Sequence, residues 1–452
     1  MGGPAWPARP WREGTVPAAA PATGGHVSAC DNDWPMTTGA ASPLSMLPAD
    51  PADAADARPG LSGLDPERLS AWLAAAGWPA YRGRQVADAV WRQLARDVTQ
   101  MRTLPGDLRA QLDREFRIDT LVTTEIHPAD GGLTEKALHV LGDGNLVESV
   151  LMHYPARPGR RERHTVCISS QVGCAVGCPF CATGELGFGR DLTTAEIVDQ
   201  VRWAARHLGR DSRRLTNVVF MGEGEPLLNL DRVLEAVSAL ADPRRFGLGA
   251  RHVTVSTSGV VPGIRRLTAL GPQFTLAVSL HAARDPLRDV LVPLNRRWPV
   301  DEVLAAARDH ARSTGRRISY EYTMIGGVND TNEDAVALAE LLRGDLAHVN
   351  LIPMNPVAHT PWTASPTLVI EAFASRLRAA GLPVTIRRNR GQEIGAACGQ
   401  LAAERAGEPP PATVARRRER LVAESAAALR GERSRTAAPV LVGSSVAGDR
   451  SS

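Results

Sequence analysis

Three cysteines lie within eight residues of one segment, and their spacing suits a metal cluster. Cys174, Cys178 and Cys181 are separated by three and then two residues. Thiolates are soft ligands for iron–sulfur clusters or zinc, and three on one loop can reach three corners of a cubane and leave its fourth iron open. A zinc site usually takes two close pairs of ligands, whereas Cys167 and Cys398 stand alone. A redox pair of Cys178 and Cys181 would leave Cys174 unexplained, so the spacing favours an iron–sulfur cluster.

The overall composition sets the compartment in which such a cluster would work. The chain has 452 residues, 43% of them hydrophobic, which is enough for one sizeable core with smaller appendages. A net charge of +3 permits a nucleic-acid partner without arguing for one. No apolar run approaches the length of a membrane span, and residues 1–25 lack the apolar core of a signal peptide. We therefore expect a cytoplasmic protein without a membrane partner, in which clustered cysteines bind metal and do not form a disulfide scaffold.

Composition and periodicity divide the chain into five regions. Residues 1–60 are rich in Pro and Ala and predict a disordered leader, and residues 404–452 predict an Arg- and Ala-rich extension that is largely disordered. Residues 61–115 have helical periodicity and predict a small accessory domain, and residues 116–160 predict a short β extension. In residues 161–403 strand and helix signals alternate. This alternation predicts a parallel sheet, open or closed into a barrel, with an active site at the carboxyl ends of its strands.

The helical region contains a start signal and a set of basic residues. Asp65 followed by Pro66 predicts a helix that begins at the proline with the aspartate as N-cap. Four arginines lie on or beside the second helix and are able to contact phosphate: Arg82, Arg84, Arg92 and Arg96. From charge alone, a solvated helix face is the favoured interpretation of these four residues.

The cysteine segment, with Phe180 directly before Cys181, resembles the signature of the radical S-adenosylmethionine (SAM) superfamily. The resemblance implies a partial (β/α)6 barrel of the α/β class, with a small N-terminal helical domain and a short β extension. It also implies a [4Fe–4S] cluster held by the three clustered cysteines. The open iron would bind the amino and carboxylate groups of SAM, and one electron would cleave SAM to a 5′-deoxyadenosyl radical.

Seven further segments, in family order over about residues 64–403, resemble the RlmN and Cfr family of RNA adenine methyltransferases. The matching segments are Val147–Val150, Cys167–Cys174, Met221–Asn229, Val255–Gly259, Val278–Ala282, Asn350–Pro356 and Arg390–Gln400. The resemblance implies methylation at C2 of an adenosine in the peptidyl transferase centre of 23S rRNA, and of the adenosine 3′ of the anticodon in tRNAs. It makes residues 61–115 a candidate for RNA docking.

The same resemblance assigns chemical roles to three residues. Cys398, in an Ala-Ala-Cys-Gly-Gln context, matches the cysteine that one SAM methylates and from which a second SAM-derived radical removes hydrogen. Cys167 matches the cysteine that resolves the protein–RNA adduct by forming a disulfide, and Glu148 matches the proton acceptor. Without the match, Cys398 would be read as a small buried hydrophobe and Glu148 as an exposed strand carboxylate. Cys30 has no assigned role.

Polar residues at or just after predicted strands match the SAM contacts of the family. Glu225 is expected to accept hydrogen bonds from the SAM amino group. A lone His281 would more often be a satisfied core residue, but its Ser-Leu-His-Ala context favours SAM binding. The full set of expected SAM contacts is Gly224, Glu225, Ser256, Ser279, Leu280, His281 and Asn355.

Three other functions remain open from the sequence. Methylation at C8 of the rRNA adenosine shares every motif above. A radical-SAM activase of a partner protein would leave Cys398 and Glu148 unexplained, and a zinc-bound RNA-binding module would be colourless where an iron–sulfur protein is brown. The resemblance further implies two SAM per turnover, an electron donor such as flavodoxin or ferredoxin, and a monomer.

Two single residues are unusual. Lys136 is the one lysine among 52 basic residues. We expect it either to contact an RNA phosphate or to support Glu148 from a neighbouring strand. A lysine on a surface strand without a specific role is about as good an interpretation. Glu223 stands where the family pattern suggests an uncharged residue.

Overall fold

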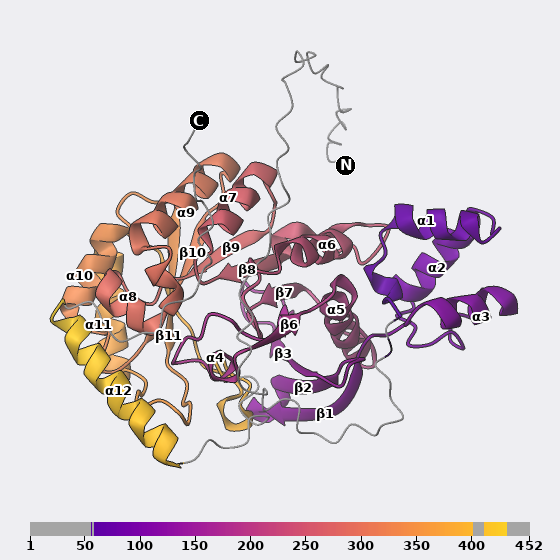
Figure 1. Cartoon of the computed structure of the whole chain (residues 1–452). Coiled ribbons are helices and arrows are strands. Elements are labelled where there is room, and N and C mark those ends of the chain that lie inside the picture. Colours follow the sequence, from indigo (N-terminus) through magenta and orange to yellow (C-terminus); the bar gives the residue numbers. More distant parts are fainter. Residues whose placement is uncertain (1–55, 57, 401–410, 432–452) are drawn as a thin grey trace, which may run out of the picture. The chain divides into compact units, whose positions relative to one another are not determined.

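A computed structural model describes residues 56, 58–400 and 411–431 of the chain (Figure 1). The predicted leader up to residue 55, with Cys30, lies outside the described residues. So do residues 401–410 and 432–452, which make up much of the predicted C-terminal extension.

Three helices precede the sheet and lie together in Figure 1: α1 (Pro66–Ala75), α2 (Tyr81–Trp91) and α3 (Gly106–Glu115). A 3-10 turn, η2 (Leu61–Gly63), comes before them. The predicted start of the first helix is confirmed, since the side chain of Asp65 accepts a hydrogen bond from the backbone N–H of Arg68 and Pro66 occupies the first turn. The helices share one apolar core, to which Leu73, Val86 and Leu108 contribute buried side chains.

A buried arginine links these helices to the main sheet region. Arg202 of α5 (Thr194–Gly209) is fully buried and pairs with Asp199. Its guanidinium donates hydrogen bonds to the backbone carbonyls of Val90, Ala95 and Ile118, at 2.6 to 3.1 Å. Because every one of these bonds has a charged donor, they hold the helical segment firmly against α5.

One ten-stranded sheet forms the centre of the described chain, with strand order β1-β2-β3-β4-β7-β8-β9-β10-β11-β12. Its first three strands, β1 (Val122–Ala129), β2 (Thr134–Val140) and β3 (Leu146–Tyr154), pair antiparallel with one another, and β3 pairs antiparallel with β4. They make up a β extension on one edge of the parallel part.

From β4 onward all neighbouring strands are parallel. The parallel strands are β4 (Arg163–Ile168), β7 (Asn217–Phe220), β8 (Val253–Thr257), β9 (Thr275–Ser279), β10 (Ile318–Met324), β11 (Ala347–Pro353) and β12 (Val384–Ile386). The connecting helices after α5 are α6 (Leu230–Ala241), α7 (Val261–Leu270), α8 (Asp285–Leu291), α9 (Val300–Thr314), α10 (Asn332–Leu341) and α11 (Thr367–Ala379). The predicted α/β architecture is therefore confirmed. The sheet is not closed, because β1 and β12 are its two unpaired edges.

A small second sheet frames the cysteine segment. β5 (Gln171–Gly173) pairs antiparallel with β6 (Phe188–Asp191), and the short helix α4 (Ala182–Leu186) lies between them. Gly173 has a φ of +70°, and a Cβ there would meet the carbonyl oxygen of Gly187 at 2.1 Å, so only glycine fits where the two strands approach. The hairpin thus holds both ends of the cysteine loop.

A further helix, α12 (Pro411–Leu429), occupies part of the region predicted to be largely disordered. It packs on α8, and Arg417 forms an ion pair with Glu185 of α4. Leu421, Ser425 and Ala428 are buried at helical spacing. An Ala- and Arg-rich composition is compatible with disorder but also has high helix propensity. The buried stripe stabilises the helix against the disordered state.

No helix among the described residues combines the length and apolar character needed to cross a membrane.

Candidate active site

The three clustered cysteines all line one pocket, here called the first pocket. Cys174 follows β5 and Cys181 caps α4, with Cys178 in the loop between them. Burial raises the pKa of the Cys174 thiol to about 12 and also raises the pKa values of Cys178 and Cys181. Within the described residues, no three His, Cys, Asp or Glu side chains converge as ligands of a single ion. Thiolates that bind different irons of a cluster do not need to converge on one point.

The carboxyl ends of the parallel strands form the rest of the first pocket. Six of the seven predicted SAM contacts line it, namely Gly224, Glu225, Ser256, Ser279, His281 and Asn355. They come from the ends of β7, β8, β9 and β11 or from the residues directly after them, as expected for a βα architecture. The side chain of Leu280 is fully buried in the core and does not line the pocket.

Glu225 is held in place by bonds from within the chain. Its Oε2 accepts from the backbone N–H and the hydroxyl of Ser258, at 2.6 and 2.7 Å, and its Oε1 accepts from the N–H of Leu227. Burial raises the pKa of this carboxyl, while the Ser258 bonds oppose the shift. Gly224 has a φ of +96°, and a Cβ there would meet the side chain of Gln171 at 2.6 Å. Glycine is therefore required where the chain turns into the pocket.

His281 is a neutral, strained residue at the pocket wall. Its φ is +60°, and its Nδ1 accepts a hydrogen bond from the N–H of Thr323 at 3.0 Å. Burial lowers its pKa to about 3, so the ring is uncharged at neutral pH. Its edge meets the ring of Phe180, with centroids 4.8 Å apart. Through this contact the cysteine loop packs directly on the end of β9.

An unsatisfied carboxylate oxygen also belongs to the first pocket. Glu321 of β10 is buried, and its Oε1 accepts from Ser319 and Asn350 at 2.8 and 2.9 Å. Its Oε2 is buried and has no hydrogen-bond partner. Buried acceptors are rarely left unpaired, and the ammonium and ribose hydroxyls of SAM are donors of the required kind. The thiols and this oxygen together fit an iron–sulfur cluster with SAM beside it. Sequence analysis did not identify Glu321.

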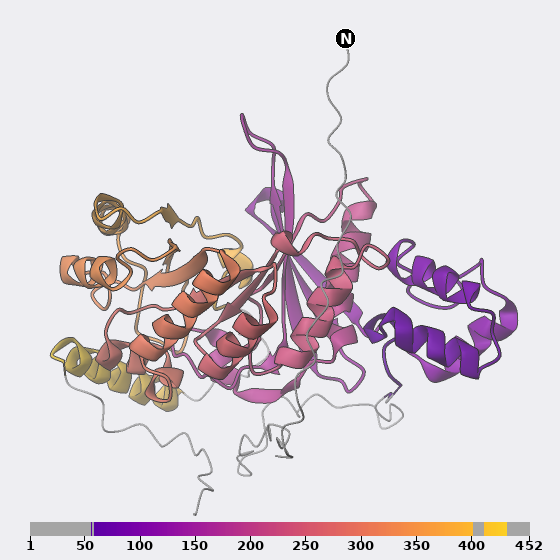
Figure 2. The ribbon, with the colours of Figure 1, turned by 90° about the horizontal axis from the view of Figure 1, so that it is seen from above.

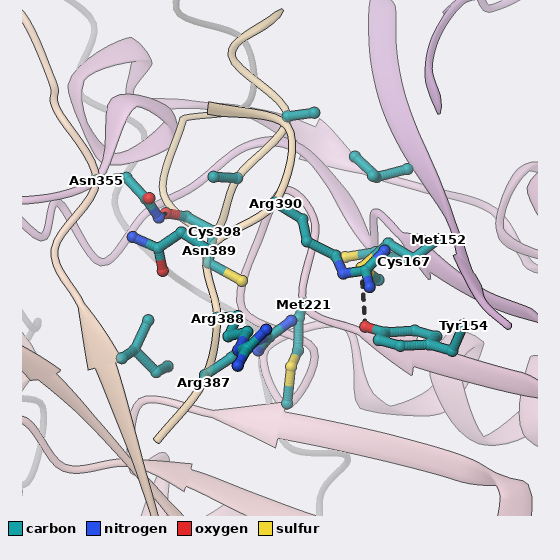
Figure 3. Close-up of a pocket in the computed structure, with 14 residues that line it drawn as sticks. Met152, Tyr154, Cys167, Met221, Asn355, Arg387, Arg388, Asn389, Arg390 and Cys398 are labelled. Atoms are coloured by element: carbon teal, nitrogen blue, oxygen red, sulfur yellow. Dashed lines mark hydrogen bonds between the residues drawn. The ribbon is translucent and has the colours of Figure 1, made fainter. Parts of the chain in front are cut away.

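A second pocket adjoins the first and contains Cys167 and Cys398 (Figure 3). Cys167 enters it from β4, opposite Val150 of β3. Cys398 comes from the segment after the 3-10 turn η6 (Gln392–Ile394) and also lines the first pocket. Both thiols are free. Burial raises the pKa of Cys167 to about 12, and the nearby Cys398 adds to the shift. Cys398 is thus the one of these two cysteines that faces both pockets.

The segment carrying Cys398 is fixed by side chains from elsewhere in the fold. The amide nitrogen of Asn355 donates to the carbonyl of Cys398 at 2.9 Å, and Gln392 donates to the Asn355 amide oxygen at 2.8 Å. Arg387 lines both pockets, and its pKa is raised mainly by the negative charge that Cys398 can carry. Sequence analysis missed Arg387, because it lies three residues before the recognised motif and nothing local distinguishes it from neighbouring arginines.

Glu148 and Lys136 form a buried ion pair beside the second pocket. Lys136 Nζ of β2 lies 3.3 Å from Glu148 Oε1 of β3, and the side chains are 3% and 2% exposed. The pair confirms the expectation that Lys136 supports Glu148 and contradicts a surface position for either residue. Glu148 does not line either pocket, but it shares a face of β3 with Val150, which lines the second.

Glu223, the departure from the family pattern, supports the same strand. Its side chain is buried, and its Oε1 accepts from the backbone N–H of Glu148 at 2.9 Å. The hydroxyl of Ser169 in turn donates to the carbonyl of Glu148 at 2.8 Å. The backbone of Glu148 is therefore held from both sides.

Replacing Lys136 with methionine is expected to lower the free energy of unfolding by about 3–5 kcal/mol, because the variant leaves the Glu148 carboxylate buried without this ammonium. Urea denaturation measures the loss. The double variant Lys136→Met/Glu148→Gln should recover part of it, since the second change removes the buried charge. If single and double variants are equally destabilised, the pair does not stabilise the fold.

Comparisons with known proteins agree with this arrangement. Residues 168–342 match the Radical SAM superfamily, and residues 60–118 match the ribosomal RNA large subunit methyltransferase N-terminal domain. A "probable dual-specificity RNA methyltransferase RlmN" from Saccharopolyspora erythraea is 50% identical over 355 residues, covering 76% of this chain and 94% of the relative. A protein of the same name from Frankia alni is 48% identical over 386 residues, covering 83% and 90%.

A solved structure is also similar over most of its length. The crystal structure of a radical SAM methyltransferase from Sphaerobacter thermophilus is 47% identical, with a TM-score of 0.73, and the match covers 76% of this chain and 99% of that one. The chain therefore belongs to the RlmN family of radical SAM RNA methyltransferases, enzymes that use an iron–sulfur cluster and SAM.

Proposed function

We propose that this RNA methyltransferase acts on C2 of adenosine, with Cys398 as the carrier of the methyl group. The observation that supports the proposal best is the position of Cys398 on the wall shared by the two pockets. A cysteine that carries a methyl group must reach the SAM-binding pocket to receive and activate that group. It must also reach the substrate pocket to transfer the carbon to RNA. The targets, by resemblance, are an adenosine in the peptidyl transferase centre of 23S rRNA and the adenosine 3′ of the anticodon in tRNAs.

Cys174, Cys178 and Cys181 would hold a [4Fe–4S] cluster in the first pocket. Gly224, Glu225, Ser256, Ser279, His281 and Asn355 line the space beside it and would bind SAM, with Leu280 able to contribute only backbone. With one electron, a bound cluster and SAM would supply the radical chemistry that removes hydrogen from carbon. We further propose two SAM per turnover, an electron donor such as flavodoxin or ferredoxin, and a monomeric enzyme.

The chain's own residues account for the remaining steps. C2 of adenine is electron-poor, so direct attack on the SAM methyl group is unfavourable, whereas a carbon radical held on the Cys398 sulfur can add to the ring. To restore the aromatic ring, the adduct would lose one electron, which a bound cluster could accept, and the proton on C2. Cys167 shares the second pocket with Cys398, and its thiolate would then attack the Cys398 sulfur. This step would form a disulfide, break the bond from sulfur to carbon, and leave the carbon to take up a proton as the methyl group. Glu148 would accept the C2 proton, and Lys136, whose Nζ lies 3.3 Å from Glu148 Oε1, would position its carboxylate. Glu148 is near this pocket without lining it, so the step requires a shift of its side chain or an intervening water.

Nucleoside mass spectrometry tests the proposal. The enzyme is purified without air, incubated with SAM, a reductant and unmodified tRNA or rRNA, and the RNA is digested. We expect 2-methyladenosine. The appearance of 8-methyladenosine would move the reaction to C8, and cleavage of SAM without any methylated nucleoside would contradict the RNA substrates named here.

A further inference from the structure

The connection between β3 and β4 is an exposed hairpin rich in arginine, here called the arginine hairpin (residues 155–163). Arg157 and Arg160 exchange two backbone hydrogen bonds at its tip, at 3.0 and 2.8 Å, and Gly159 has the positive φ, +76°, that such a turn needs. Every residue of the hairpin is exposed. Figure 2 shows this connection projecting beyond the sheet. It is therefore a defined structure that presents its side chains to the surroundings.

The charges of the arginine hairpin are not neutralised within the described chain. Arg157, Arg160 and Arg161 make no side-chain hydrogen bond or ion pair with any described residue. The one carboxylate of the hairpin, Glu162, lies 3.3 Å from His164 Nε2, so one carboxylate stands against four arginines. Unpaired like charges on one short loop repel one another, so a local group of this kind is better explained by an anionic partner than by stability.

The base of the arginine hairpin connects to the second pocket. Tyr154 lines that pocket together with Cys167 and Cys398. The guanidinium of Arg163 lies over the Tyr154 ring at 4.2 Å, and that of Arg390 lies over the same ring at 4.5 Å.

Arg390 and Arg388 differ in the contacts that their side chains make within the chain. Arg390 is additionally fixed by a hydrogen bond to the carbonyl of His153 at 2.9 Å. Arg388, two residues earlier, lines the pocket, is exposed and has no ion-pair partner among the described residues. Positive charge therefore runs from the hairpin tip to the opening of the pocket.

We propose that the arginine hairpin, with Arg388, is the surface that binds phosphates of the RNA beside the nucleoside entering the second pocket. The inference rests on the proposed function and adds where the RNA lies. Guanidinium groups match phosphate oxygens in a bidentate geometry, and phosphate contacts fix the position of a nucleic acid without reading its sequence. A base that leaves its stack to react needs such a hold on its flanking backbone.

The arginines of the helical region are weaker candidates for this role. Arg82 donates to Gln85 at 2.6 Å and Arg92 pairs with Asp88 at 3.3 Å. Arg84 and Arg96 are exposed and make no side-chain hydrogen bond or ion pair with a described residue. None of these four arginines lines the second pocket, whereas the arginine hairpin begins directly after Tyr154, which does. Either region remains able to touch RNA, but the hairpin is the one placed to position the target nucleoside.

The test compares two variants with the same loss of charge. One is Arg157→Ala/Arg160→Ala/Arg161→Ala in the arginine hairpin. The control is Arg343→Ala/Arg376→Ala/Arg378→Ala. Arg343 follows α10, and the other two lie in α11; all three are exposed, line neither pocket and form no ion pair with described residues. Binding of an unmodified tRNA transcript is followed by fluorescence anisotropy at several KCl concentrations. Methylation kinetics on the same transcript give KM and kcat separately.

In the hairpin variant we expect weaker binding and a slope of log affinity against log salt that is smaller by about 2, since each lost phosphate contact removes about 0.7–0.9. KM for RNA should rise, and kcat at saturating RNA should stay within about twofold, because the hairpin does not touch the reacting atoms. The control should retain the slope of the wild type. If the two triple variants bind tRNA alike, the proposal is wrong, and a surface for an acidic protein becomes the better interpretation. If the wild type makes no 2-methyladenosine but the hairpin variant still loses RNA affinity, the proposed function fails while the docking surface stands.

Discussion

Replacing Cys398 with alanine is expected to abolish methylation of RNA, lowering the yield of methylated adenosine by at least about a thousandfold. The variant removes the sulfur that is proposed to carry the methyl carbon, and Cys398 borders both the first and the second pocket. The three clustered cysteines remain in place. We therefore expect iron content and reductive cleavage of SAM to persist while the RNA product disappears, as measured by nucleoside mass spectrometry and by release of 5′-deoxyadenosine.

Cys30→Ala is the matched control for this experiment, because it also removes one thiol but lies outside the described residues and has no role in the proposal. It should methylate RNA as the wild type does. Methylation that survives in Cys398→Ala at the wild-type rate would show that carbon reaches RNA without this sulfur. Cys167→Ala adds a second check. Loss of the resolving thiol should leave RNA covalently attached to the protein, seen as a shifted band that disappears on digestion with nuclease.

Replacing Cys178 with alanine should remove the cofactor itself. Cys178 is the middle one of the three clustered cysteines that line the first pocket and is proposed to bind the cluster. Losing outer-shell partners of a metal site already costs about 10–100-fold in affinity. Loss of a direct thiolate should cost more. We expect protein purified without air to lack the brown colour and most of the iron of the wild type, and to cleave no SAM.

The two cysteine variants differ in a way that separates carrier from ligand. Cys398→Ala keeps iron and SAM cleavage, whereas Cys178→Ala loses both. If Cys178→Ala retained full iron content, the three-cysteine loop would not hold the cluster. If the wild-type protein contained zinc in place of iron, the three cysteines would be part of a zinc site.

The sequence alone was enough to place most of the candidate site in one pocket. Glu225, Ser256 and His281 were expected to lie together because each ends or follows a strand, and the carboxyl ends of parallel strands meet at one edge. The cysteine loop is likewise a local feature, since its three cysteines fall within eight residues. Local rules also gave the beginning of α1, where Asp65 and Pro66 act within a single turn.

Other parts of the site were decided by tertiary packing. Glu321 reads as one polar residue in an apolar strand, and only the positions of Ser319 and Asn350 leave one of its oxygens unsatisfied beside the pocket. Arg387 becomes relevant because the chain folds Cys398 back beside it. The sequence predicted disorder where α12 forms, because the packing on α8 and the burial of Leu421 and its neighbours depend on tertiary structure.

The ion pair of Lys136 and Glu148 shows the division most clearly. From the sequence, Lys136 was expected either to contact an RNA phosphate or to support Glu148. The register of β2 and β3 places it beside Glu148. In the pairing of β2 with β3, Leu138 lies opposite Glu148 and Lys136 lies opposite Val150. Lys136 and Glu148 are therefore diagonal neighbours on one face of the sheet. Burial then makes the pairing necessary, because a carboxylate and an ammonium that are both withdrawn from water are stable only together. Spacing along the chain indicated which side chains could take part in the chemistry. Contacts between distant segments determined the partners of these side chains and which of them line the two pockets.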